Sequence, residues 1–543
     1  MYQEINLDSI LALERQIKER RGCEKTIIPL KRTRNSLLNI SILLPPEILG
    51  NIFRWNVTPD GDFGGLSKGS YNFLLVCHHW FEVASRTPEL WRFWGNTVQD
   101  WAHRHARCGT APLDLVLAKY PSYDFDDKIR DALQDRAARD LVRRVHLTGI
   151  KAAGLFSSVI SSIVTEGEKS QSNSVESFIV DSTDKSPVDV SPFFSRYYLP
   201  KLRHLRLSGC TISSWDLLKS HTMALTTLEL TDTQQSPILT SSQLLSILSS
   251  NPLLQHLVLS PNLPPDVIDG DRTSTKIPLC HLKRLRLKSD FRPAFGLLNR
   301  LELPDEMDNL RLNLHGCSHS NISHTLGPFL GDHLRRRGGF SGGGLGLLAY
   351  PTPYSLDFNA GDAHGGDDSA VAGWFVEVSG FMDVELGDDE ADRLCLDLIS
   401  HIPREQIISL QTSLPILLSE ELCIEMRNLT NLHLGAVDLS TWFAGQNIPI
   451  HHTFKKYLRG LDHIVITEPV LSGGDWSPLT NFLSQRAGAG NRVSSLRLRG
   501  HPRMDQSVVE SIERLVKVVD FGHRRTHRKP RVEGTIAGSY RVA

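Results

Sequence analysis

The sequence of 543 residues lacks several features that define common protein classes. Its eight cysteines are scattered and form no CxxC pair, which excludes a disulfide framework and a paired-cysteine zinc finger. No run approaches the roughly 18 apolar residues of a membrane span, and the opening MYQEINLDSI lacks the apolar core of a signal peptide. A net charge of -1 gives the whole chain no attraction to nucleic acid or membrane. We therefore expect a cytoplasmic and/or nuclear protein without a membrane partner, and the charge does not favour a nucleic-acid partner.

Signatures of catalysis and of cofactor binding are also missing. The glycine-rich stretches 338–346 and 359–370 are followed by no Gly-Lys-Ser/Thr, which a phosphate-binding loop requires. No serine or cysteine lies in a recognisable nucleophile motif. The segment HGCSHSNISH offers zinc-ligand residue types in an uncommon spacing, at His315, Cys317, His319 and His324. The sequence thus predicts a protein that is not an enzyme, with no catalytic residue, no cofactor and no metal site.

What the sequence does contain is a proline-bounded helical stretch between residues 43 and 94. In LLPPEILGNIF, Pro45 and Pro46 fall in a first helical turn, and Glu47 lies at the positive end of the helix dipole. A second helix is predicted by apolar residues at helical spacing, namely Phe73, Val76, Cys77, Trp80 and Ala84. A third is predicted by a Thr87 cap and Pro88, with the apolar residues Leu90, Trp91 and Trp94. Three helices this short need another surface to cover their apolar stripes.

At these residues the sequence resembles the F-box family. The family's opening Leu-Pro-x-Glu-Ile/Leu matches Leu44, Pro45, Glu47 and Ile48; its Val-Cys-x-x-Trp matches Val76, Cys77 and Trp80; its closing Leu-Trp matches Leu90 and Trp91. Over most of its length the chain is similar to the large fungal set of F-box-like proteins. The departure from the family pattern is TPDGDFGGLSKGS, residues 58–70, which we interpret as an inserted surface loop.

The resemblance implies a module that docks on a Skp-family adaptor and thereby joins a cullin–RING (SCF-type) ubiquitin ligase complex. The rest of the chain would be the substrate receptor and would bind a target protein that the sequence does not identify. The adaptor-binding residues implied by the match and its apolar stripe are Leu44, Pro45, Ile48, Leu49, Ile52, Val76, Trp80, Leu90 and Trp91.

Beyond Trp94 the sequence repeats a leucine pattern. LPKLRHLRLSGC places leucines at 202, 205 and 207 and a cysteine at 210, as in leucine-rich repeats. The triplet recurs at 225, 228, 230, at 254, 257, 259, at 282, 285, 287 and at 298, 301, 303, and looser copies begin at Val142, Val175, Leu429, Leu461 and Val493. Amphipathic segments such as SSQLLSILSS lie between the triplets and predict helices. Alternating strands and helices predict a parallel solenoid.

Side chains beside the inward leucines would point to the opposite, concave face of such a sheet. That face is the predicted substrate-binding surface, with His204, Arg206, Glu229, His256, Arg284, Arg286 and Lys288 as candidate residues. The basic row of Arg284, Arg286 and Lys288 could recognise acidic or phosphorylated segments, or it could be an ordinary solvated face.

The predicted fold class is α+β, with a small all-α F-box-like module followed by an α/β leucine-rich-repeat solenoid (horseshoe). The predicted parts are a helical segment at 1–40, the module at 41–95, the solenoid at 110–519 with a Gly/Asp-rich insertion at about 331–373, and a basic tail at 520–543. Within the first part, Ile10, Leu13 and Ile17 favour a helix packed on the module over a dimerisation helix. The tail sequence HRRTHRKPR leaves open a nuclear-import or nucleic-acid contact, or no role.

A different class of function is compatible with the same patterns. The chain could be a protein-interaction scaffold outside any ligase, in which the helical module only caps the exposed end of the solenoid core. Recovery of a Skp-family adaptor would separate the two interpretations.

Overall fold

The computed structural model divides into two compact units, residues 1–304 and 305–543. The residues that the structure describes are 7–19, 29–31, 33, 44–57, 71–95, 106–118, 131, 133, 138, 140–150, 174–182, 187–196, 199–221, 224–232, 239–260, 263, 276–318, 321–337, 345–352, 355–362, 375–382, 393, 396–412, 420–435, 439, 458–469, 475–500 and 504–521.

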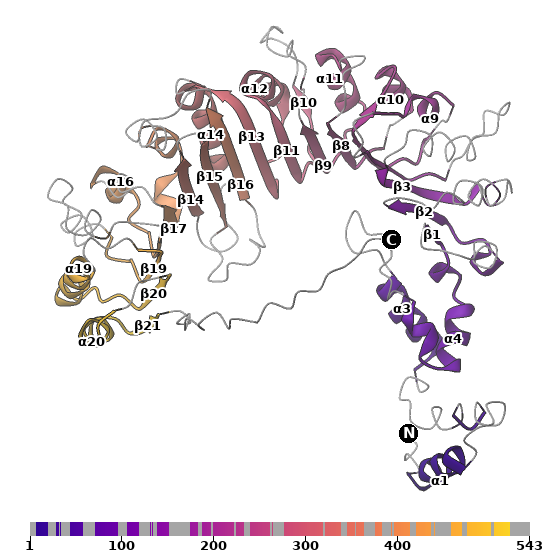
Figure 1. Cartoon of the computed structure of the whole chain (residues 1–543). Helices are drawn as coiled ribbons and strands as arrows, with labels where there is room; N and C mark the ends of the chain where they lie inside the picture. Colours follow the sequence, from indigo (N-terminus) through magenta and orange to yellow (C-terminus); the bar gives the residue numbers. More distant parts are fainter. Residues whose placement is uncertain are drawn as a thin grey trace, which may run out of the picture. The chain divides into compact units, whose positions relative to one another are not determined.

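The first unit begins with helices and continues as alternating strands and helices (Figure 1). Its first elements are α1 (Leu7–Glu19), α3 (Pro46–Val57), the 3-10 helix η2 (Asn72–Leu75), α4 (His78–Ser85) and the 3-10 helix η3 (Pro88–Leu90). Then follow β1 (Phe93–Gly95), β2 (Leu113–Ala118), β3 (Val142–Ile150), β4 (Ser177–Ser182), β5 (Val188–Asp189), α9 (Ser191–Arg196), β6 (His204–Ser208), β7 (Cys210–Thr211), α10 (Asp216–His221), β8 (Thr227–Thr231), α11 (Ser241–Ser249), β9 (His256–Ser260), β10 (Ile277–Pro278), β11 (Arg284–Asp290), α12 (Phe291–Arg300) and β12 (Leu301–Glu302).

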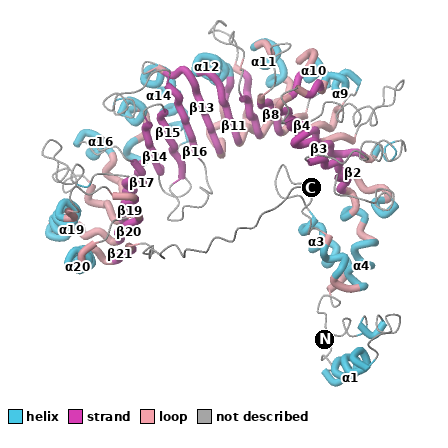
Figure 2. The backbone as a smooth tube through the Cα atoms, viewed as in Figure 1, coloured by secondary structure: helices cyan, strands magenta, loops and turns pink. Residues whose placement is uncertain are grey.

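The sheet of the first unit is parallel throughout, in the order β1-β2-β3-β4-β6-β8-β9-β11. Its register places the leucines of successive strands in line, so that Leu205 is opposite Leu228, and Leu228 is opposite Leu257. These leucines are buried, and helices α9 to α12 lie along one side of the strands (Figure 2). Each strand therefore completes its core only with its neighbours and the helices beside them.

Helix α11 illustrates how the sequence sets an element boundary. The Thr240 side chain accepts a hydrogen bond from the Gln243 backbone N–H, and the Gln243 side chain accepts one from the Thr240 N–H. This capping box fixes the start of the helix and directs Leu244, Ile247 and Leu248 into the core.

The second unit contains β13 (Asn309–Cys317), the π-helix η5 (Ile322–Leu326), α14 (Gly327–Arg337), β14 (Leu345–Thr352), β15 (Ser355–Asp362), β16 (Phe375–Met382), η6 (Arg404–Gln406), β17 (Ile407–Thr412), α16 (Glu420–Glu425), β18 (Asn431–Gly435), β19 (His463–Thr467), α19 (Ser477–Gly488), β20 (Ser495–Arg499), α20 (Gln506–Leu515) and β21 (Val518–Asp520). Its strand order is β13-β16-β15-β14-β17-β18-β19-β20-β21. Strand β15 is antiparallel to both neighbours, whereas the other pairs are parallel.

The predicted fold class, α+β with a separate all-α module followed by a solenoid (horseshoe), was wrong. The described chain is a parallel α/β protein, and its helical start is continuous with the sheet because β1 pairs with β2. Phe93 and Trp94 of β1 are buried, whereas the sequence pattern assigned Trp94 to a third helix. Leucine triplets after a turn are typical of any buried parallel strand, so the pattern identified strands without fixing the architecture.

Three local predictions were also wrong. The second predicted helix is interrupted at Val76 and Cys77, between η2 and α4. The third is a single 3-10 turn, and the Thr87 hydroxyl donates to the Val83 carbonyl oxygen instead of capping it. The last leucine triplet begins at the end of α12 and continues in β12, which pairs with β10 in a separate small sheet.

Other predicted segments fall partly or wholly outside the described residues. The insertion at 58–70 and the tail from residue 522 lie outside them. The range 331–373 contains most of α14 together with β14 and β15, and the alternation of Leu345 and Leu347 with glycine at 346 is compatible with a strand.

Candidate docking and binding surfaces

Helix α3 presents three different faces, which the sequence pattern merged into one stripe. Leu49, Phe53 and Val57 are buried, at spacings of four residues. Ile48 and Ile52 are each 47% exposed, and Trp55 is 83% exposed. The third face lines a cleft of about 360 Å³ together with α4 and η3, and Gly50 and Arg54 belong to it. The helix therefore uses one apolar face for its own core and leaves another in contact with solvent.

Aromatic stacking holds the buried face of α3 in place. The Phe53 ring stacks on Phe73 with centroids 4.4 Å apart and lies 5.1 Å from Trp80 at a tilted angle. The Trp91 indole N–H donates to the Ala84 carbonyl oxygen at 2.9 Å, so the 3-10 turn is tied to α4. Residues 44–57 and 71–95, referred to below as the helical segment, thus have a small core of their own.

The predicted adaptor-binding residues separate into two groups. Leu49, Leu90 and Trp91 are buried, so they stabilise the helical segment and offer no docking surface. Leu44 and Trp80 are partly exposed, and four others are exposed, namely Pro45, Ile48, Ile52 and Val76. The structure therefore brings together on the surface only part of the predicted set.

Three exposed apolar residues of the helical segment were missed. They are Trp55, Leu75, which is 86% exposed, and Phe81, over whose ring the Arg107 guanidinium lies at 5.3 Å. Trp55 lies three residues after Ile52 and seven after Ile48, so helical spacing already indicated that it shares their face. The large apolar side chains exposed on the helical segment are therefore six, namely Ile48, Ile52, Trp55, Leu75, Val76 and Phe81.

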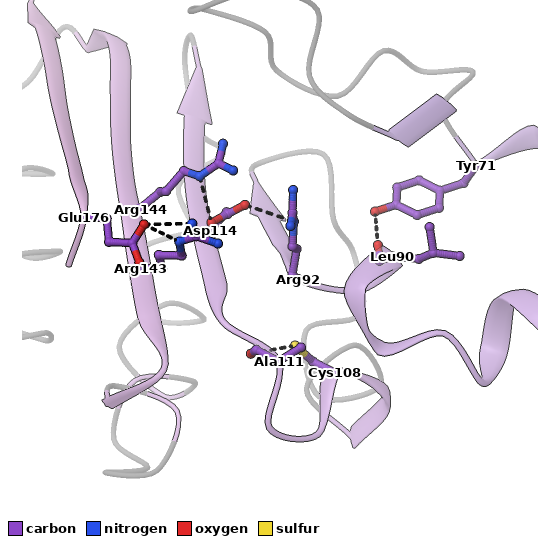
Figure 3. A network of polar contacts seen from close by, with 9 residues as sticks. All are labelled: Tyr71, Leu90, Arg92, Cys108, Ala111, Asp114, Arg143, Arg144 and Glu176. Atoms are coloured by element: carbon purple, nitrogen blue, oxygen red, sulfur yellow. Dashed lines mark hydrogen bonds and ion pairs between the residues drawn. The ribbon is translucent and has the colours of Figure 1, made fainter. Parts of the chain in front are cut away.

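A buried carboxylate connects the helical segment to the sheet (Figure 3). The Asp114 side chain on β2 is buried, and its oxygens lie 3.2 Å from Arg92 Nε and 3.4 Å from Arg144 Nε. Burial raises the pKa of Asp114, although both guanidinium groups oppose that rise. Beside it, Arg143 and Glu176 pair at 2.7 Å across β3 and the start of β4.

The strand residues between the inward leucines form the predicted substrate surface, and several of them neutralise one another. Arg206 on β6 and Glu229 on β8 form an ion pair at 3.2 Å, and both are largely buried. His204 Nδ1 lies 3.1 Å from the Thr227 hydroxyl oxygen. These side chains therefore link adjacent strands, and their charges are largely compensated within the fold.

The basic row on β11 differs from its neighbours. Arg284 and Arg286 are exposed and Lys288 is partly exposed, and within the described residues none of the three pairs with a carboxylate. The register places His256 beside Arg284 and Val258 beside Arg286 on β9. His256 belongs to the same face, so all seven predicted substrate-surface residues lie on β6, β8, β9 and β11.

Groups for metal binding or nucleophilic chemistry are not assembled in the described part of the chain. No cluster of three or more His, Cys, Asp or Glu side chains suited to a metal ion occurs there, and His319 lies outside it. Burial raises the pKa of the Cys108 thiol to about 11 and that of the Cys210 and Cys423 thiols to about 12, so all three are protonated at neutral pH.

No family model matches the sequence, and no curated protein matches it significantly. Within the described residues, the helices are all too short or too polar to cross a membrane.

Proposed function

We propose that this protein is the non-catalytic substrate-recognition subunit of an SCF-type ubiquitin ligase, with the helical segment as the binding site for a Skp-family adaptor. The observation that carries the proposal is the concentration of exposed apolar side chains. Of nine large apolar residues exposed in the described part of the chain, six lie between residues 48 and 81. Exposed apolar side chains gathered in one small region indicate a protein-binding surface.

The composition of this surface supports a protein partner. Trp55, Leu75 and Phe81 contribute large apolar areas, and tryptophan is among the residues that dominate binding energy when a partner covers it. Binding residues would then be Ile48, Ile52, Trp55, Leu75 and Val76, with Pro45 at the start of α3. The parallel sheet would bind the target protein, and holding that target near the ligase raises the effective concentration of its lysines.

A second candidate, a protein-interaction scaffold outside any ligase, has its own observation. Strand β1 covers one side of β2, as a cap at the end of a sheet would. Capping a sheet, however, does not require apolar side chains in contact with solvent, and Trp55 and Leu75 are both exposed. We therefore favour the receptor.

The test is co-purification with a Skp-family adaptor. Ile52→Asp and Trp55→Asp place a charge on the exposed face of α3 without touching Phe53 or its stacking partners, so folding should be retained. Leu253→Asp is the matched control, because Leu253 is 49% exposed but lies next to β9. We expect the wild type and the control to retain the adaptor and the two α3 variants to lose it. Recovery of no adaptor by the wild type would refute the proposal.

A further inference from the structure

The unpaired cations of β11 are arranged in a line. Arg284, Arg286 and Lys288 occupy alternate positions of one strand, between the buried Leu285 and Leu287. Because alternate side chains of a strand share a face and are about 6.6 Å apart, three positive charges follow the strand direction at regular intervals.

The adjacent strand β9 carries no acidic side chain that compensates this row. The residues on β9 that share its face are His256, Val258 and Ser260, none of which is acidic. Two strands away on the same face, Glu229 on β8 is acidic, and its carboxylate pairs with Arg206 at 3.2 Å. Asp290 ends β11 at the next alternate position after Lys288 and is the acidic residue closest to the row along the strand, but among the described residues it forms no ion pair with the three cations. The positive charges of Arg284, Arg286 and Lys288 are therefore not neutralised by ion pairs within the described residues.

From this arrangement we infer that the β11 row is a binding site for an extended peptide segment of a partner protein that carries acidic or phosphorylated side chains at alternate positions. An extended peptide repeats its side chains on one face every two residues, which is the same interval as the row. Each guanidinium group of Arg284 and Arg286 can form a two-pronged contact with a carboxylate or a phosphate, and Lys288 adds a third charge.

A nucleic acid would also supply regularly spaced negative charges, but the surrounding residues do not favour it. Binding of single strands relies mostly on Phe, Tyr and Trp side chains on which bases stack, and none of these three residue types occurs on this face of β6, β8 or β9. The whole chain has a net charge of -1, which gives no attraction to polyanions beyond the row itself.

In the receptor, this site would recognise the target protein, and that role rests on the proposed function. Peptide binding itself is measured on the isolated full-length chain without any adaptor. A loss of peptide binding and a loss of adaptor binding are therefore separate results.

The experiment is fluorescence anisotropy with three labelled probes. The first is a peptide with glutamate at three alternate positions separated by serine, the second has the same composition with the glutamates contiguous, and the third is an eight-nucleotide oligo(dT). We expect the alternating peptide to bind most tightly, and its affinity to fall as salt is raised because the site is exposed. Replacing the glutamates with phosphoserine should tighten binding, since each phosphate carries nearly two charges.

The variants are Arg286→Glu and the pair Arg284→Glu with Arg286→Glu, with Lys283→Glu as control. Lys283 is exposed and directly precedes the strand, so its reversal makes the same change in net charge as Arg286→Glu, outside the row. We expect roughly tenfold weaker binding for Arg286→Glu, more for the pair, and no change for the control. Equal binding by wild type and Arg286→Glu, equal affinity for the two peptides, or tighter binding of oligo(dT) would each overturn the inference.

Discussion

The Nε atom of Arg92 lies 3.2 Å from Oδ2 of Asp114, at the point where the chain leaves the 3-10 turn and enters the sheet. The backbone repeats the connection, because the Asp114 N–H donates to the Arg92 carbonyl oxygen at 2.9 Å. The position of the helical segment against β2 is thus fixed by a side-chain pair and a backbone bond between the same two residues.

Replacing Asp114 with alanine should destabilise the protein. Arg92 and Arg144 would face each other without the carboxylate between them, and both are only partly exposed. We expect the free energy of unfolding to fall by about 2 kcal/mol, less than for a fully buried pair because solvent still reaches both guanidinium groups. Urea denaturation measures the change. Asp332→Ala is the control, since its pair with Arg335 is exposed; a similar loss there would contradict the argument.

His146 should make stability depend on pH. Burial, together with the nearby positive charge of Arg144, lowers its pKa to about 4. A histidine with a depressed pKa in the fold contributes stability that is complete above pH 6.5 and is lost as the pH falls towards 4. The contribution is about 3 kcal/mol as an upper bound.

Unfolding free energies of wild type and His146→Gln at pH 7, 5.5 and 4 measure this contribution. The Ser177 hydroxyl oxygen lies 2.9 Å from His146 Nε2, and glutamine can keep a hydrogen bond to it. We expect the wild type to lose free energy of unfolding relative to His146→Gln as the pH falls from 6.5 to 4. Parallel pH profiles would show that His146 is not the group responsible.

Arg486 should be important for the second unit through hydrogen bonds to the backbone. It is buried in α19, and its guanidinium donates to the carbonyl oxygens of Leu458 at 3.0 Å and Leu461 at 2.9 Å. Arg486→Met would leave these two acceptors without partners in the interior, with an expected loss of about 3 kcal/mol. Arg492 also donates to backbone carbonyl oxygens but is exposed, so Arg492→Met should cost about 1 kcal/mol or less. Thermal unfolding of both variants measures whether Arg486→Met loses more stability than Arg492→Met.

Two glycines provide a matched test of packing. A Cβ on Gly331 of α14 would collide with the carbonyl oxygen of His401, whereas a Cβ on Gly488 of α19 would meet nothing within 4 Å. Gly331→Ala should destabilise by about 2 kcal/mol. Gly488→Ala should be neutral or stabilise by up to about 1 kcal/mol, because alanine restricts the unfolded chain. Equal melting temperatures for the two variants would argue against the close approach of α14 to His401.

The strands were the most predictable part of the fold. The leucine spacing located β6, β8, β9 and β11 because it depends on side-chain alternation within a few residues. The fold class was not predictable from the same signal, since it depends on pairings between residues far apart in sequence, such as β13 with β16 or β14 with β17. Local sequence contains no direct information on such pairings.

The candidate docking surface was only partly predictable. Ile48 and Leu49 are adjacent and both apolar, so composition could not indicate which one is buried. Leu49 is on the same face as Phe53, whose ring stacks on Phe73, and Phe73 is separated from Phe53 by the insertion at 58–70. On the strand face, by contrast, the pairing of Arg206 with Glu229 could have been predicted, because both residues occupy the same place in consecutive leucine triplets.

Strand β1 has a practical consequence for anyone who wants to study the helical segment alone. A polypeptide ending at Gly95 would lack β2, and the backbone groups of Phe93, Trp94 and Gly95 would lose their hydrogen-bonding partners. Such an unpaired edge, carrying two large aromatic side chains that are buried in the full-length protein, favours self-association. A soluble fragment should therefore extend at least through Ala118, and because β2 itself pairs with β3, extension through Ile150 would also cover the other edge of β2.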